Sequence, residues 1–263
     1  MPAPFGLIGY GAIGTEIGRV LTHLGETGAL KAVLVREGRN AERFAAVHSA
    51  DALCGNGIRT VLECAGHAAV REHGAAVLRA GLDLVVTSIG ALSDPRVAAE
   101  LSAAAQGGGR LLLAPGAVGG LDGLLAARLG GLASASYTSI KPPHAWRGTP
   151  AEGLIDYDNP AEEQVLFDGT AREAAARFPK NANVAVAVGL CALGLDDTRA
   201  VLVSSRKVSD PLGVIEAAGA FGRMRYETFA HAAPANPKTS LLTAYSLLQC
   251  ARLGQGIPVL DLL

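Results

Sequence analysis

The sequence predicts an α/β fold in which a Rossmann-type, doubly wound parallel sheet is followed by a second, mixed α/β domain. Over residues 5–114, short apolar runs alternate with segments of helical periodicity. Runs that are apolar throughout are typical of parallel strands covered by helices on both faces. A GxGxxG motif directly after the first run supports the same fold class.

The first domain is expected over residues 1–115. Its predicted strands share a continuous apolar character and lie at residues 5–9, 31–35, 60–64, 83–87 and 110–114. Helices are expected between them, where apolar side chains recur at helical spacing, at residues 13–24, 41–48, 68–80 and 95–105. Each strand–helix–strand unit then forms a crossover, and together these units build one parallel sheet.

The second domain is expected over residues 116–238, because the pattern changes at a glycine-rich turn near residue 115. A helix is predicted at residues 121–129, and strand-like runs occur at residues 135–140 and 199–203. Residues 141–169 are rich in Pro, Gly and acidic side chains, so they are expected to form a long ordered loop or a short insertion.

Three further features belong to this second half. Trp146 either closes the long loop over a substrate or anchors it by packing. Residues 213–218 and 223–229 flank a glycine-containing turn and predict a hairpin that can pair across a dimer interface. A last helix at residues 239–253 is expected to pack back on the first domain, together with the rest of segment 239–263.

The composition limits the classes of partner. With 49% hydrophobic and 18% charged residues, the chain is unlike one that is mainly disordered. A formal net charge of −1 offers no basic surface for nucleic acid, so we expect a small-molecule partner.

The N-terminus lacks a positively charged leader, and glycines and charges interrupt residues 111–132, so we expect a cytoplasmic protein without a membrane span. The cysteines lack zinc spacing and are expected to be reduced, buried thiols: Cys54, Cys64, Cys191 and Cys250.

The glycine motif predicts a dinucleotide site. Gly9 permits a tight turn, Gly11 lets the backbone approach a pyrophosphate, and Gly14 lets the helix pack closely on the strand. The helix N-terminus then provides N–H donors for the phosphates. The alternative is a glycine-rich turn that binds nothing, but the strand, the spacing and the helix together favour a dinucleotide.

The residues after the second strand leave the choice of cofactor open. An arginine here accommodates the 2′-phosphate of NADP, whereas an acid binds the ribose 2′-hydroxyl of NAD. The sequence has Arg36 followed by Glu37, and either is equally consistent with a solvated surface charge. The predicted cofactor is therefore NAD or NADP.

Six segments resemble the L-aspartate dehydrogenase family, and the resemblance runs nearly from end to end. They are ECAGHAAV (63–70), TSIGALSD (87–94), APGAVGGLDG (114–123), KPPHAWRGTP (141–150), FPKNANVAVAVG (178–189) and NPKTSLLTAYS (236–246). The resemblance implies a Rossmann domain, an α/β substrate and dimerisation domain, and a homodimer. It also implies NAD(P)-dependent interconversion of L-aspartate with iminosuccinate, which hydrolyses to oxaloacetate and ammonia and feeds NAD biosynthesis in some members.

The resemblance also implies cofactor contacts at Ala117 and Asn183, beside the glycine loop and the turn at residues 88–90. The predicted cofactor-binding residues are Gly9, Gly11, Ala12, Ile13, Gly14, Arg36, Cys64, Ala65, Ser88, Ile89, Gly90, Ala117 and Asn183. One position departs from the family. Its catalytic histidine, in an N-x-H-x-I segment, corresponds to Gly213, and the preceding asparagine corresponds to Pro211.

Two polar clusters are candidates for binding a dicarboxylate substrate, which needs cations and N–H or O–H donors. Lys180 and Asn181 stand directly before an apolar helical pattern, whose N-terminus attracts an anion. Lys238 and Thr239 form the second cluster, although the hydroxyls of Thr239 and Ser240 are equally suited to capping the last helix.

Lys180, His231 and His144 are the candidates for the proton-transfer group. Histidine titrates near neutrality, and a desolvated lysine can do so as well, which also makes Lys141 a possibility. The alternatives are structural histidines and a proton relay through water. A different amine substrate, with Gly213 enlarging the pocket, and a catalytically silent dinucleotide-binding protein also remain open.

Overall fold

The computed structural model describes residues 3–179, 181–233, 236–259 and 262–263, and at residues 232–233 and 236–239 it describes the backbone alone. The chain forms two compact units. Unit 1 consists of Met1–Gly116 together with Thr243–Asp261 and Leu263, and unit 2 consists of Ala117–Leu242 and Leu262.

Unit 1 contains a seven-stranded sheet in the order β14-β6-β5-β4-β1-β2-β3. The strands are β1 (Phe5–Ile8), β2 (Leu30–Leu34), β3 (Ala46–Val47), β4 (Thr60–Glu63), β5 (Asp83–Val86), β6 (Leu111–Leu113) and β14 (Ile257–Pro258). All neighbours pair in parallel except β14, which runs antiparallel to β6. Since β1 pairs with both β2 and β4, the strand order reverses beside β1, and the predicted Rossmann-type fold is confirmed.

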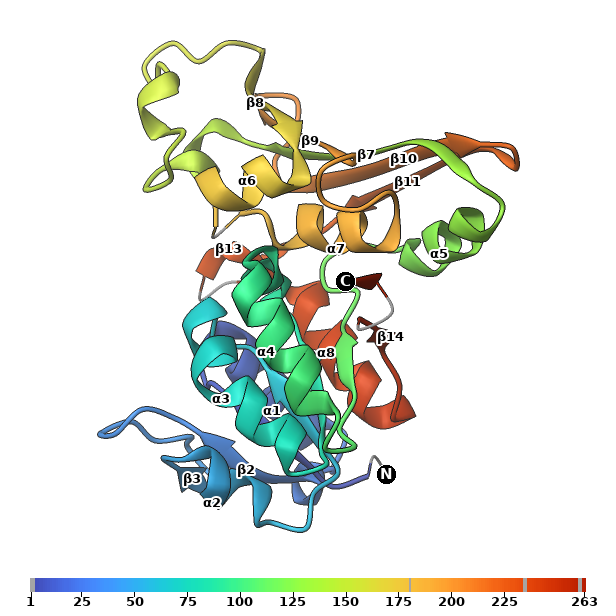
Figure 1. The fold of residues 1–263 in the computed structure, drawn as a ribbon. Coiled ribbons are helices and arrows are strands. Elements are labelled where there is room, and N and C mark those ends of the chain that lie inside the picture. Colours follow the sequence, from blue (N-terminus) through green and yellow to red (C-terminus); the bar gives the residue numbers. More distant parts are fainter. Residues whose placement is uncertain (1–2, 180, 234–235, 260–261) are drawn as a thin grey trace. The chain divides into compact units, whose positions relative to one another are not determined.

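Helices cover both faces of this sheet (Figure 1). They are α1 (Ala12–His23), α2 (Ala50–Cys54), α3 (His67–Arg79), α4 (Pro95–Ala105) and α8 (Leu241–Leu253), with 3-10 turns η1 (Thr27–Ala29) and η2 (Ile89–Ser93). Phe5 and Leu7 of β1 pack in one core with Ile17 of α1 and Leu247 of α8. The alternate residue, Gly6, faces α2, which lies with α3 and α4 on the other side.

The helix predicted at residues 41–48 is absent. This segment instead contains a bridge between Ala41 and Phe44, followed by β3, whose residues pair in parallel with Val33 and Leu34 of β2. Backbone pairing at the edge of the sheet outweighs the local preference for a helix. The helix begins later, at α2, where the Ser49 hydroxyl accepts a hydrogen bond from the backbone N–H of Ala52 (3.1 Å).

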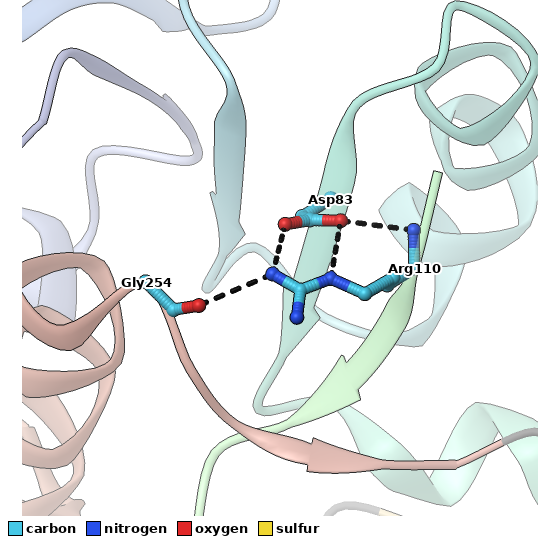
Figure 2. Close-up of polar contacts among 3 residues, drawn as sticks. All are labelled: Asp83, Arg110 and Gly254. Carbon is cyan, nitrogen blue, oxygen red and sulfur yellow. Dashed lines mark hydrogen bonds and ion pairs between the residues drawn. The ribbon is translucent and has the colours of Figure 1, made fainter. Parts of the chain in front are cut away.

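An arginine joins three segments of unit 1 at the amino ends of its strands. The Arg110 guanidinium donates through Nε and Nη2 to the two carboxylate oxygens of Asp83, at 3.0 and 2.6 Å, and Nη2 also donates to the carbonyl of Gly254 at 3.1 Å (Figure 2). Asp83 begins β5 and Arg110 directly precedes β6. The C-terminal segment that continues to β14 is thereby tied to the sheet.

Unit 2 contains a five-stranded sheet in the order β11-β10-β7-β9-β8. The strands are β7 (Leu132–Lys141), β8 (Glu163–Thr170), β9 (Arg199–Ser205), β10 (Leu212–Gly219) and β11 (Gly222–Phe229), and only the β7–β9 pair is parallel. The helices α5 (Leu121–Leu129), α6 (Ala171–Arg177) and α7 (Asn183–Cys191) lie on one face of the sheet (Figure 1). The predicted β10–β11 hairpin is confirmed, with Ala220 and Phe221 at its turn.

The region 141–169 is more ordered than the sequence predicts. It contains η3 (Pro143–Trp146) and η4 (Glu152–Leu154), and residues 163–169 form all of β8 except its last residue; β8 pairs with β9. Trp146 is fully buried, so it anchors this region by packing. None of the helices in the described part of the chain has the length and apolar character needed to cross a bilayer.

A short two-stranded sheet precedes the last helix. Its strands are β12 (Ala232–Ala233) and β13 (Asn236–Ser240). The helix α8 then begins at Leu241 and not at residue 239, and the Ser240 hydroxyl accepts a hydrogen bond from the backbone N–H of Leu242 (3.2 Å). Capping of the last helix by Ser240 is therefore confirmed.

Candidate functional site

The glycine loop after β1 is shaped by contacts that tolerate no side chain. Gly9 has φ +96°, and a Cβ placed there would lie 2.7 Å from the Cβ of Ala65 in the loop after β4. A Cβ on Gly14 would lie 2.6 Å from the carbonyl oxygen of Gly9. Both glycines therefore allow the turn, the helix and the neighbouring loop to pack against one another.

Gly11 differs from the other two glycines because its surroundings are open. Among the described residues, and apart from the backbone next to it in the chain, no atom lies within 4 Å of the position that its Cβ would occupy. Gly11 is the N-cap of α1, and no side-chain hydrogen bond caps this helix. The N-terminus of this 12-residue helix thus follows a glycine that leaves room beside the backbone, an arrangement suited to a pyrophosphate.

Glu63, the last residue of β4, connects two further loops at the same edge of the sheet. Its Oε1 accepts hydrogen bonds from the backbone N–H groups of Ala65 (2.7 Å) and Gly66 (2.8 Å). Oε1 also accepts from the Ser88 hydroxyl (2.9 Å), and Oε2 accepts from the Ser88 backbone N–H (3.1 Å). The carboxylate is completely buried and joins the loop after β4 to the loop after β5.

Two opposing effects act on this carboxyl group. Burial raises the pKa of Glu63 above its usual value, and the hydrogen bonds from Gly66, Ser88 and Ala65 act in the opposite direction. The neighbouring Cys64 thiol lies 3.4 Å from the carbonyl oxygens of Ile8 and Gly9. Burial, followed by the proximity of Glu63, raises the pKa of the Cys64 thiol well above its usual value, which favours the protonated form.

The four cysteines are free thiols, as predicted, but only two of them are fully buried. Cys191 and Cys250 lie in the interior, whereas Cys54 and Cys64 are partly exposed. Cys54 is the last residue of the short helix α2, and Cys64 follows directly after β4, so both stand where secondary structure ends.

The other predicted cofactor residues of unit 1 lie around these loops. Ala12 and Ile13 begin α1 and are partly buried, while Arg36 and Glu37 are exposed beyond the end of β2. Ser88, Ile89 and Gly90 are buried. Because the Ser88 hydroxyl and N–H both bond to Glu63, this residue shapes the loop. Contact of these residues with a cofactor stays a prediction.

In unit 2, Ala117 precedes α5 and Asn183 is the first residue of α7; both are partly exposed. Several polar residues gather at one edge of the five-stranded sheet, where β7, β9 and β11 end and β10 begins. This edge carries Gly213 near the start of β10, His144 shortly after β7 and His231 shortly after β11.

The space beside Gly213 is filled. A Cβ at this position would lie 3.2 Å from Cγ1 of Val118 and 3.3 Å from both Cε2 and the hydroxyl oxygen of Tyr137. Tyr137 is buried, its hydroxyl is hydrogen-bonded to the Ser139 side chain, and burial raises its pKa to about 12. A side chain at residue 213 would therefore need Val118 or Tyr137 to shift by a few tenths of an ångström, and the interpretation of Gly213 as enlarging a pocket stays a prediction.

His231 forms a polar pair that the sequence did not reveal. Its Nδ1 lies 3.3 Å from Oδ2 of Asp210. The N–H of Ala230 donates to the carbonyl of Pro211 (3.1 Å), which holds His231 close to the start of β10. A cavity of about 290 Å³ lies beside the pair, and it is lined by Lys207, Val208, Ser209, Asp210, Phe229, Ala230 and His231. The pair thus borders a space that Lys207 also lines.

The remaining candidates are less informative. His144 lies on η3 and is exposed. Asn181 is partly exposed, and its backbone N–H donates to the carbonyl of Phe178 (2.8 Å). Lys180 lies outside the described residues, and for Lys238 and Thr239 only the backbone, in β13, is described.

Glu63 and Asp210 are the polar residues that sequence reasoning missed. Glu63 stands at the end of an apolar run directly before a glycine-containing loop, and a lone acid in that position is a signal that could have been used. Asp210 lies in a polar stretch, SRKVSD, where nothing distinguishes it from a solvated charge.

Comparison with known proteins gives a consistent result over both units. A family model for the C-terminal domain of aspartate dehydrogenase matches residues 122–253, and a model for the NAD-binding domain of homoserine dehydrogenase matches residues 9–115. The L-aspartate dehydrogenase of Ruegeria pomeroyi is 44% identical over 251 residues, covering 94% of this chain and 90% of the relative. That of Serratia proteamaculans is 42% identical over 262 residues, covering 95% and 97%.

Solved structures show the same fold. The aspartate dehydrogenase from Thermotoga maritima superposes with a TM-score of 0.74 over 97% of this chain and 98% of that chain, at 22% identity. A homoserine dehydrogenase from Thiobacillus denitrificans gives a TM-score of 0.56 over 97% and 74%, at 15% identity.

Proposed function

The chain belongs to the L-aspartate dehydrogenase family, and on that premise we propose that it catalyses the NAD(P)-dependent interconversion of L-aspartate and iminosuccinate, which hydrolyses to oxaloacetate and ammonia. The observation that carries the proposal is the edge of the unit 1 sheet at which the strand order reverses. There the loops after β1, β4 and β5 meet, and Gly11 leaves the N-terminus of α1 open to a phosphate.

The residues present fit a nicotinamide dinucleotide. Gly9 and Gly14 keep the loop tight, and the free N–H groups at the start of α1 would hold the pyrophosphate. The predicted contacts at Ala117 and Asn183 belong to the same proposal. When bound, the nicotinamide provides the hydride chemistry, and the protein provides binding, orientation and proton transfer.

His231 is the proposed proton-transfer group. Oxidation of the amine removes a hydride from Cα and a proton from nitrogen, so a base must stand near that nitrogen. The contact between Asp210 and Nδ1 orients the imidazole and leaves Nε2 to exchange the proton. Lys207, in the same cavity, is the nearby cation suited to a substrate carboxylate, although it also pairs with Glu162 at 3.0 Å.

The test is NAD(P)⁺ reduction with L-aspartate, beside NAD(P)H consumption with oxaloacetate and ammonia. His231→Asn is expected to lower kcat by about 10²- to 10⁴-fold. The matched control is His144→Asn, because His144 is also an exposed histidine at this edge, and we expect it to keep most of the activity. Full activity of His231→Asn would refute the assignment of His231, and absence of turnover with aspartate in either direction would refute the substrate.

We further propose that the enzyme accepts both NAD and NADP, since Arg36 and Glu37 are both exposed after β2 and available to the ribose. Arg36→Ala should raise KM for NADP more than KM for NAD. An equal effect on both would exclude a role of Arg36 in recognising a 2′-phosphate. A cytoplasmic homodimer completes the proposal, with gel filtration as its test.

Gly213 favours a second candidate function. With no side chain at the position that corresponds to the family histidine, the protein can bind a dinucleotide without turning over aspartate. It would then act on another amine or as a silent dinucleotide-binding protein. Tight binding of NAD(P)H without aspartate turnover would support this second function, and a screen of amino acids would separate its two forms.

A further inference from the structure

We propose that Glu63 is a positioning residue of the dinucleotide site, a buried carboxylate that holds the loops after β4 and β5 in the arrangement that receives the cofactor. This inference rests on the proposed function, because it assigns a further residue to the dinucleotide site described there. The residues joined to Glu63 are Ala65, Gly66 and Ser88, which come from two loops far apart in the sequence.

The two carboxylate oxygens of Glu63 accept four hydrogen bonds. Oε1 accepts three hydrogen bonds of 2.7 to 2.9 Å, and Oε2 accepts the fourth, from the Ser88 N–H, at 3.1 Å. Three of the four donors are backbone N–H groups, so the carboxylate determines where the main chain of both loops runs. Because every one of these contacts is donated to Glu63, a group that only accepts suits the position best.

Glu63 also takes the role of a helix cap. Gly66 is the N-cap of α3 and has no side chain, and no side-chain hydrogen bond from this residue caps the helix. Glu63, placed before the N-cap, accepts N–H groups from this terminus and puts a negative charge at the positive end of a 13-residue helix. The start of α3 is thereby fixed relative to β4.

The loops held by Glu63 touch the glycine loop. Ala65, whose N–H donates to Glu63, lies so close to Gly9 that a Cβ there would be 2.7 Å away. The Cys64 thiol, adjacent to Glu63, lies 3.4 Å from the Gly9 carbonyl oxygen. A displacement of the β4–α3 loop would therefore be transmitted to the turn that approaches the pyrophosphate.

A charge is not required for structure alone, because neutral side chains can connect two loops. Burying a carboxylate is costly, and such groups occur preferentially at functional sites. Glu63 lies at the carboxyl end of β4, next to β1, where the strand order reverses and where ligands of open α/β sheets bind. Its position fits the role of holding a binding surface in one shape before the cofactor arrives.

The test compares two carboxylates of the same sheet. Glu63→Gln keeps the size of the side chain and one acceptor oxygen, but it places an amide donor against the Ser88 N–H. Asp83→Asn is the matched control, because Asp83 joins segments at the opposite, amino-terminal edge through Arg110 (Figure 2). NADH and NADPH are titrated by fluorescence, and the melting temperature and the KM for L-aspartate are measured for each variant.

We expect Glu63→Gln to raise the Kd for NADH at least tenfold, with a much smaller change in the KM for aspartate. Asp83→Asn should lower the melting temperature and leave the Kd within twofold. Ser88→Ala, a milder variant that keeps the carboxylate, should weaken NADH binding severalfold and lower the melting temperature by a few degrees, and it tests the proposal if Glu63→Gln fails to fold.

Three results would overturn the proposal. The first is NADH binding by Glu63→Gln within twofold of the wild type. The second is that Glu63→Gln and Asp83→Asn both raise the Kd for NADH, each by a factor that follows the decrease in its melting temperature. The third is unchanged binding by Ser88→Ala where Glu63→Gln does not fold. Failure of the wild-type protein to bind either dinucleotide is a distinct outcome, because it refutes the dinucleotide site itself.

Discussion

Replacing Gly213 by histidine tests whether the position can still hold an imidazole. Gly213 lies in β10 with extended backbone, so the conformation accepts any residue. The obstacle is space, because its Cβ would already lie 3.2 Å from Val118 and 3.3 Å from Tyr137. An imidazole adds a ring beyond that atom, and overpacking of this kind costs about 1–3 kcal/mol.

The cost of overpacking is partly offset, because the substitution removes a glycine from a strand. Glycine inside a strand is less stable than alanine by roughly 0.5–1 kcal/mol, so Gly213→Ala should change the free energy of unfolding by less than about 1 kcal/mol. Gly213→His should then destabilise unit 2 by about 1–2 kcal/mol net. Val118→Ala makes room next to the ring, and the cost of Gly213→His should fall by at least about 0.5 kcal/mol in that background.

The assay is urea denaturation followed by tryptophan fluorescence. Trp146 is the only tryptophan and is buried in unit 2, so its signal reports on this unit. The reasoning is refuted if Gly213→His is as stable as the wild type, or if its cost is the same with and without Val118→Ala. Any gain in aspartate turnover is expected in the double variant, where the imidazole has space.

Three further outcomes are expected. Trp146→Ala should lower the free energy of unfolding by about 3–5 kcal/mol, measured by circular dichroism in urea, because it empties a fully buried site. Burial raises the pKa of Tyr137 to about 12, so the stability contributed by its neutral hydroxyl is present below pH 10 and is lost as the pH rises toward 12. Tyr137→Phe should abolish this decline, which amounts to at most about 3 kcal/mol. Asn183→Ala should abolish cofactor-dependent turnover, and unchanged kcat/KM would exclude its predicted role.

The elements that the sequence predicts well are those whose pattern is local. β1 and the centres of β4 and β5 are apolar, and the glycine loop follows β1 directly, so the Rossmann-type fold follows from neighbouring residues. β3 is only two residues long and exists because β2 offers a free edge. β8 starts with Glu163 and Gln164, and this polar start made the strand look like the end of a loop.

In the candidate site, too, features set by neighbouring residues could be predicted and features set by distant residues could not. The positive φ of Gly9 and the contact of Gly14 with the Gly9 carbonyl could be predicted, because both lie within one turn and its helix, whereas the approach of Gly9 to Ala65 could not. The partner of Glu63, Ser88, is 25 residues away, and Asp210 is 21 residues from His231. Polar groups whose partners come from other strands can be identified only when the sheet that brings them together is known.

The division of unit 1 into two stretches of sequence affects how the protein is made. Helix α8 completes the core around Phe5 and Leu7, yet the ribosome synthesises it only after nearly all of unit 2. Unit 2 is almost one continuous stretch, whereas the apolar face that α8 covers in unit 1 stays open until residues 243–253 have been synthesised. Unit 1 is therefore completed only after nearly all of unit 2 has been synthesised, and an apolar surface that is exposed in this interval is prone to aggregation.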